Sequence, residues 1–77
     1  MKNVEVYTQP DCPPCKIVKQ FLQHHHIPFI EYNIKKDSAA RNRLQSDYNS
    51  YSTPTVVVNG EAVTGFDLEK LQNLLDI

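Results

Sequence analysis

The sequence has no tryptophan, one methionine and only two glycines among its 77 residues. It has no apolar run close to the roughly 20 residues that a membrane-spanning helix needs. Its formal net charge of −1 gives no excess of either sign, which argues against binding to nucleic acid or to an anionic membrane surface. The N-terminal stretch MKNVEVYT lacks the apolar segment of a secretion signal. Together these absences predict a cytoplasmic protein.

What the chain does contain is the composition of a folded protein. Hydrophobic residues make up 40% and charged residues 22%, which is typical of globular domains and not of disordered chains. The chain has no internal repeats and no linker-like segments, so we expect a single domain over residues 1–77. We also expect a monomer. At this length a chain is near the lower limit for building its own core.

Apolar periodicity and turn residues predict the element order β-α-β-α-β-β-α. Strands are expected at residues 3–8, 28–34, 55–58 and 61–63. Helices are expected from Cys12 to residues 24–26, from Asp37 or Ser38 to about Tyr48, and after Asp67. The expected core residues are Val4, Val6, Ile17, Val18, Phe21, Leu22, Ala40, Leu44, Tyr48, Phe66, Leu68, Leu71, Leu74 and Leu75.

Two connections determine the expected topology. A strand, a helix and a second strand in one sheet form a right-handed parallel crossover. Asn59-Gly60 favours the type I′ turn of a tight hairpin, which adds an antiparallel pair. The sequence therefore predicts an α/β fold, with a mixed four-stranded sheet flanked by helices.

The most informative motif is Cys12-Pro13-Pro14-Cys15, which holds both cysteines of the chain. A structural disulfide is a poor explanation, because it would not persist in a reducing cytosol and would close a very short loop. A structural zinc site needs four ligands, and His24, His25 and His26 lie roughly 14–17 Å further along the helix at 1.5 Å per residue. We expect no metal ligands here and interpret the histidines as a solvated helix end.

A redox pair is the chemistry that this position favours. Cys12 is expected at the N-terminus of a helix, where unpaired N–H groups stabilise a thiolate, the form that attacks a disulfide. Cys15 follows one turn later and is placed to attack the resulting mixed disulfide. Cys12 is thus the candidate nucleophile and Cys15 the candidate resolving thiol.

Two segments resemble the glutaredoxin family of the thioredoxin-like superfamily. VYTQPDCPPC is similar to the family's signature, and TPTVVVNGEAVTGF to its proline segment, hairpin and glycine turn, so the resemblance covers essentially the whole chain. It implies a thioredoxin/glutaredoxin-like fold in which Pro54 is cis and lies beside the cysteines. It also implies that the backbone of Thr53 pairs with a substrate peptide.

The candidate substrate-binding residues surround the cysteine pair. Thr53 and Pro54 are expected to form a docking edge, helped by Gly65, whose missing side chain permits close backbone approach. Tyr7 and Tyr51 could line the groove beside Cys12. The full set of candidates is Tyr7, Pro13, Pro14, Thr53, Pro54 and Gly65. Basic residues that could hold a carboxylate of a tripeptide thiol, or simply form a solvated face, are Lys35, Lys36, Arg41 and Arg43.

Several positions depart from the patterns of related groups. Thioredoxins carry a buried Asp and a Trp where this chain has Val6 and Asp11. Many glutathione-binding glutaredoxins carry a Lys and a Tyr where it has Gln9 and Pro14. The turn at Gly65 is more similar to the small redoxins that serve ribonucleotide reductase, which are recharged by thioredoxin reductase.

The expected function is that of a small dithiol thiol–disulfide oxidoreductase, an enzyme or electron carrier that reduces protein or low-molecular-weight disulfides. No bound cofactor is expected. The expected partners are disulfide-containing proteins and a reductant, which is glutathione, another low-molecular-weight thiol or thioredoxin reductase. An alternative is a metal or iron–sulfur cluster carrier in which Cys12 of two chains bridges a cluster. A further alternative is a partner-binding module in which the cysteines are incidental.

Overall fold

The fold is built around β1 (Val4–Thr8), in which four of five residues are buried. In the computed structural model, which describes residues 3–77, β1 pairs in parallel with β2 (Ile30–Asn33) and antiparallel with β3 (Thr55–Val58). β3 pairs antiparallel with β4 (Glu61–Thr64), so the strand order is β2-β1-β3-β4. The predicted mixed four-stranded sheet, with its parallel crossover and its hairpin, is confirmed.

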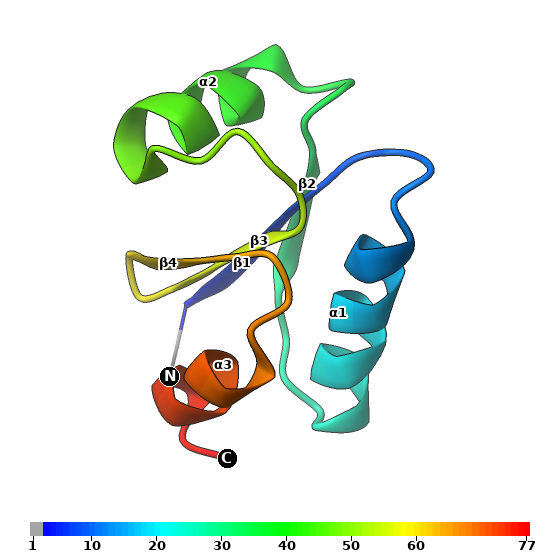
Figure 1. The fold of residues 1–77 in the computed structure, drawn as a ribbon, viewed down its shortest axis with the longest axis vertical. Helices are drawn as coiled ribbons and strands as arrows, with labels where there is room; N and C mark the ends of the chain where they lie inside the picture. Colours follow the sequence, from blue (N-terminus) through cyan, green and yellow to red (C-terminus); the bar gives the residue numbers. More distant parts are fainter. Residues whose placement is uncertain (1–2) are drawn as a thin grey trace.

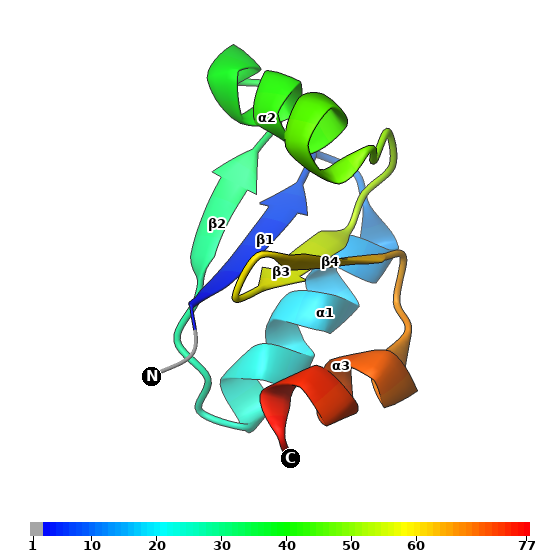
Figure 2. The same cartoon turned by 90° about the vertical axis from the view of Figure 1, so that its left-hand side faces the viewer.

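Helices cover both faces of this sheet. α1 (Pro13–His24) and α2 (Ser38–Tyr48) lie on opposite sides of the strands (Figure 1). α3 (Leu68–Leu75) shares a face with α1 (Figure 2), and the predicted element order is confirmed. The buried residues between the sheet and α1 and α3 are Val4, Val6, Val18, Leu22, Val56, Val58, Val63, Leu71 and Leu75. The smaller core beneath α2 consists of Tyr7, Ala40, Leu44 and Val57.

Each helix begins at a side chain that caps its first turn. Cys12, Asp37 and Asp67 all have extended backbone conformations, and each side chain accepts a backbone N–H three residues later. Such caps satisfy donors that have no partner inside the helix. The three predicted helix starts are therefore confirmed, and Cys12 is a cap as well as a candidate nucleophile.

The Asn59-Gly60 turn closes the β3–β4 hairpin as predicted. Both residues have positive φ, at 50° and 87°, which a type I′ turn requires. Asn59 also forms two hydrogen bonds with Asn3. The backbone N–H of Asn59 donates to the Asn3 carbonyl at 2.8 Å, and the side-chain oxygen of Asn59 accepts the Asn3 N–H at 2.8 Å. The hairpin is thus fastened to the start of β1.

Three residues expected in the core are substantially exposed. Ile17 is 50% exposed because the buried face of α1 is the stripe Cys15, Val18 and Leu22, and Ile17 points to one side of it. Leu68 is 39% exposed at the first position of α3. Phe66 is 40% exposed, with its ring edge-on to Phe21 at a centroid distance of 6.2 Å. These three core predictions are wrong.

The strand bounds differ slightly from expectation. β1 begins one residue later, β4 extends to Thr64, and β2 is shorter than the predicted 28–34. The single domain expected over residues 1–77 includes two residues outside the described part, and it stays a prediction. No helix within residues 3–77 is long and apolar enough to cross a membrane.

Candidate active site

The cysteine pair lies where the loop after β1 enters α1. Cys12 caps the helix and is half-buried, whereas Cys15, in the first turn, is 2% exposed. The two residues form a disulfide with a Cα–Cα distance of 5.3 Å. Because Cys15 is almost completely buried, Cys12 is the sulfur that an outside molecule can reach. The predicted roles of nucleophile and resolving thiol require such an asymmetry, and they stay predictions.

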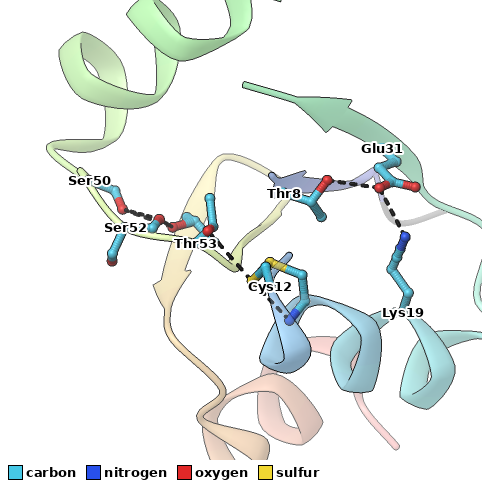
Figure 3. Close-up of a disulfide and its surroundings, with 9 residues drawn as sticks. Thr8, Cys12, Lys19, Glu31, Ser50, Ser52 and Thr53 are labelled. Atoms are coloured by element: carbon cyan, nitrogen blue, oxygen red, sulfur yellow. Dashed lines mark hydrogen bonds and ion pairs between the residues drawn. A yellow bond between two sulfur atoms is a disulfide. The ribbon is translucent and has the colours of Figure 1, made fainter. Parts of the chain in front are cut away.

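Two donors approach the sulfur of Cys12. The Cys15 amide donates to Cys12 Sγ at 3.2 Å, and Pro14, at the second helical position, has no N–H to add. The Thr53 hydroxyl donates to the same sulfur at 3.7 Å from the far side of the site (Figure 3). The single helical amide was predicted. The hydroxyl was not, because Thr53 is 41 positions away in sequence and had been given only a backbone role.

The expected docking edge lies next to the disulfide. The Thr53–Pro54 peptide bond is cis, and the Gly65 N–H donates to the Pro54 carbonyl at 2.9 Å. Gly65 has φ of 70°, and a Cβ built there would meet no atom within 4 Å. Glycine is therefore favoured here by the positive φ rather than by crowding. The structure thus brings the Thr53 hydroxyl to Cys12 and joins Gly65 to Pro54, the residue after Thr53, and it leaves Pro13 and Pro14 exposed on the helix turn.

A charged network occupies the opposite side of the disulfide (Figure 3). The Thr8 hydroxyl and the Lys19 ammonium both donate to Glu31 Oε2, at 2.8 and 3.1 Å. Burial alone would raise the pKa of Glu31, but these two hydrogen bonds and the charge of Lys19 outweigh it and lower the pKa. The three residues come from β1, α1 and β2, so no local sequence pattern could have predicted the network.

An open cavity of about 650 Å³ lies between this network and the cysteine pair. Cys12, Cys15, Glu31 and Lys19 all contribute to its wall, and Thr53 does not. The disulfide therefore has the cavity, with the charged Glu31 and Lys19, on one side and the docking edge on the other.

Tyr7 does not lie in the groove beside Cys12. It is fully buried under α2, with its ring stacked on Tyr32 at a centroid distance of 5.2 Å. Arg43 Nε donates to the Tyr7 hydroxyl at 2.8 Å, and the Arg43 guanidinium lies 4.6 Å from the Tyr32 ring centroid. Burial raises the pKa of Tyr7 although the Arg43 bond opposes this. Tyr7 is thus a core residue, and Arg43 packs on it instead of forming a solvated face.

The other sequence candidates lie on the surface. His24, His25 and His26 are exposed at the end of α1, and Tyr51 is 76% exposed in the loop before Thr53. Lys35, Lys36 and Arg41 are also exposed. Within residues 3–77, no three His, Cys, Asp or Glu side chains are grouped so that they could hold a metal ion.

A cysteine pair at a helix N-terminus, on a mixed sheet covered by helices on both faces, defines a thiol–disulfide oxidoreductase of the thioredoxin-like class. The sequence profile of the glutaredoxin family matches residues 4–63. The chain therefore belongs to the glutaredoxin family, as its sequence motifs indicated, and it is a thiol–disulfide oxidoreductase.

The proteins to which this chain is similar match it over most of its length. The thioredoxin-like protein BC3987 is 65% identical with a TM-score of 0.91, over 94% of this chain and 99% of that one. A glutaredoxin from Archaeoglobus fulgidus is 31% identical with a TM-score of 0.84, over 97% and 87% of the two chains. A glutaredoxin-like 8.6 kDa protein in the rubredoxin operon of Clostridium pasteurianum is 26% identical, over 95% and 97%.

The two donors to Cys12 give a prediction for the reduced protein. Thr53→Val removes the hydroxyl and is expected to raise the pKa of Cys12, whereas Pro14→Tyr adds an amide N–H at the second helical position and is expected to lower it. Hydrogen bonds to charged groups contribute about 1.5–3 kcal/mol, and one pKa unit is about 1.36 kcal/mol, so each shift should not exceed about two units.

The pH dependence of iodoacetamide alkylation measures both shifts. Tyr51→Phe, in the same loop but exposed, is the matched control for Thr53→Val. If the pKa of Cys12 in Pro14→Tyr were unchanged or higher, the missing N–H of Pro14 would not be what limits stabilisation of the Cys12 thiolate. An unchanged pKa in Thr53→Val would show that the hydroxyl does not stabilise the thiolate.

Proposed function

We propose that this protein is a dithiol protein-disulfide reductase that carries two electrons from a cellular reductant to disulfide-containing proteins. The observation that supports the proposal is that the two sulfurs differ in exposure and in hydrogen bonding. Cys12 caps α1, accepts two hydrogen bonds and is half-exposed, while Cys15 is buried one turn away. A structural disulfide would need no such difference.

The proposed reaction has two steps. The Cys12 thiolate attacks a substrate disulfide, so that one new S–S bond forms and one substrate sulfur leaves as a thiolate that takes a proton. Cys15 then loses its proton and attacks Cys12 Sγ, which releases the second substrate sulfur as a thiol. The protein is left with the Cys12–Cys15 disulfide, having given two electrons to the substrate. A bound cofactor is unnecessary, because the two sulfurs carry the electrons.

We place the substrate at Thr53, Pro54 and Gly65, with Pro13 and Pro14 forming the opposite rim. The Thr53 hydroxyl reaches Cys12 Sγ, Gly65 is bonded to Pro54, and the proline pair follows Cys12 directly in the chain. Tyr7 is left out of the binding set because it is buried. We further propose that the protein works as a monomer in the cytoplasm, where a reductant keeps the pair in its dithiol state.

Glutathione is expected to be a weak reductant for this protein. Gln9 and Pro14 stand where the glutathione-binding pattern has Lys and Tyr, so a charge-assisted contact worth about 1.5–3 kcal/mol is missing. The double variant Gln9→Lys, Pro14→Tyr should therefore improve glutathione-coupled turnover at low glutathione concentration. Gln23→Lys, which adds the same charge at an exposed position near the end of α1, is the control. Strong, saturable turnover by the wild-type protein at low concentration would contradict this expectation.

One experiment tests the function and its reductant together. The oxidised protein is offered either glutathione with glutathione reductase or thioredoxin reductase alone, and NADPH consumption is followed with a protein disulfide as final acceptor. Consumption in one arm, lost in Cys12→Ser, supports the proposal and identifies the electron source. If neither these systems nor dithiothreitol allowed the protein to reduce any disulfide, the proposed function would be wrong.

A further inference from the structure

The Asn59-Gly60 turn places a side-chain amide next to a backbone nitrogen that no side chain shields. Both residues are exposed, and a Cβ built on Gly60 would meet no atom within 4 Å. Within residues 3–77 the Gly60 N–H donates no hydrogen bond. No other asparagine of the chain is followed by glycine. Asn59 is therefore the side chain at which attack by the following backbone nitrogen is least hindered.

Such an attack deamidates asparagine in steps that need only water. The Gly60 nitrogen loses its proton and forms a bond to Asn59 Cγ, and the side-chain nitrogen leaves as ammonia. The product is a cyclic succinimide. Water then opens the ring at either carbonyl carbon, which gives aspartate or isoaspartate. No oxidation or reduction takes place, and in both products a carboxylate replaces a neutral amide.

The conformation of the turn holds the reacting atoms apart. The first central residue of a type I′ turn has a ψ of about 30°, so the Asn59 and Gly60 nitrogens lie on the same side of the Asn59 Cα–C bond. The Cβ of Asn59 occupies another corner of the same tetrahedral carbon and is directed away from the Gly60 nitrogen. A succinimide ring needs Cβ and this nitrogen on one side. The ring therefore closes only after the peptide group between the two residues has rotated.

Two hydrogen bonds to Asn3 oppose this rearrangement. The Asn59 backbone N–H donates to the Asn3 carbonyl, and Asn59 Oδ1 accepts the Asn3 N–H, both at 2.8 Å. The turn between β3 and β4 lies beside the start of β1 in both views of the fold (Figure 1, Figure 2). To bring Cγ to the Gly60 nitrogen, the Asn59 side chain must leave the Asn3 N–H. Asn3 thus holds the amide in an unreactive position.

We propose that Asn59 is a deamidation site whose rate is controlled by the opening of its hydrogen bonds to Asn3. While these bonds are formed the amide is protected, and when they open the Gly60 nitrogen can attack. An isoaspartate product lengthens the backbone of the turn and disturbs the register of β3 with β4. β4 leads to Gly65, whose N–H donates to the Pro54 carbonyl, so the modified hairpin is the one that supports the docking edge. The site is independent of the cysteine pair and of the proposed function.

The test compares Asn3→Pro with Asn3→Ala. Proline removes the N–H that Asn59 Oδ1 accepts and keeps the carbonyl, whereas alanine keeps both backbone groups and removes only an exposed side chain. Each protein is incubated at mildly alkaline pH, in buffer and in urea, and peptide mapping by mass spectrometry follows aspartate and isoaspartate at position 59. In buffer we expect Asn3→Pro to deamidate about two- to tenfold faster than wild type, the effect of one lost hydrogen bond. Asn3→Ala should match wild type, and all three should be fastest, and equal, in urea.

Hydrogen exchange separates local opening from a general loss of stability. The Asn59 amide reports the bonds to Asn3, and the Val57 amide reports the sheet, because Val57 pairs with Glu5 in β1. In Asn3→Pro we expect faster exchange at Asn59 and unchanged exchange at Val57. Equal deamidation of folded wild type and Asn3→Pro would overturn the proposal, as would a wild-type rate that is the same in buffer and in urea. A faster rate that is accompanied by equally faster exchange at Val57 would also overturn it, because unfolding of the sheet would then control the reaction.

Discussion

Cys12→Ser protein is expected to lose all measurable disulfide reduction, while Cys15→Ser protein is expected to stop halfway with substrate attached. The first substitution removes the half-exposed sulfur that accepts hydrogen bonds from the Cys15 amide and the Thr53 hydroxyl. The second leaves that nucleophile in place and removes the group that would release the substrate. Since neither serine hydroxyl can form a disulfide, the reaction cannot bypass either loss.

Mass spectrometry of each variant after exposure to a disulfide-linked peptide measures the outcome. The expected product is a stoichiometric peptide adduct on Cys12 of the Cys15→Ser protein and little or none on Cys15 of the Cys12→Ser protein, because Cys15 is 2% exposed. Thermal unfolding of both variants in their reduced forms is the control for folding. An adduct on Cys15 with none on Cys12 would falsify the assignment of the two roles.

The second large effect is expected in the core, from two leucines of α3. Leu71 is fully buried between α3 and the sheet, whereas Leu68, one turn earlier, is 39% exposed. Leu71→Ala removes buried methyl groups and leaves a cavity, which should lower the free energy of unfolding by about 2–5 kcal/mol. Leu68→Ala should cost less than about 1 kcal/mol, because that side chain is already partly in water.

Urea unfolding of the two variants in parallel checks this difference. Both substitutions exchange Leu for Ala in the same short helix, so helix propensity and composition are matched, and only burial differs. A small domain has limited total stability, so Leu71→Ala should move the unfolding midpoint far below that of the wild-type protein. Similar midpoints for the two variants would contradict the burial that separates them.

The sequence predicted the features that depend on local chemistry. Asn59-Gly60 indicated its turn because only residues that tolerate positive φ fit there. Asp37 and Asp67 indicated helix starts because their side chains satisfy free N–H groups. Cys12 as a cap, with one amide donor remaining after the proline pair, followed from the same rule. These are properties of four or five consecutive residues, and the fold does not alter them.

The predictions were wrong or incomplete where the burial of a residue depends on which other element packs on its helix or strand. Leu68 continues the apolar spacing of α3, yet it is the first residue of that helix and remains 39% exposed. Tyr7 alternates with Val6 as a strand predicts, but α2 closes over its face and Arg43 packs on its ring. The Thr53 hydroxyl and the Glu31 network join segments that are far apart in the chain, and only the folded arrangement places them beside the sulfurs.

The burial of Cys15 has a consequence for the order in which reductant and substrate can bind. Both the reductant and the substrate must react at Cys12, because it is the accessible sulfur. The two partners therefore compete for one site and cannot bind at the same time. Turnover should then follow ping-pong kinetics, with each partner inhibiting the other at high concentration. Tight docking would slow such a shuttle, because the first partner has to depart before the second arrives. A protein with one accessible sulfur should therefore work best when its complexes with reductant and substrate are weak and short-lived.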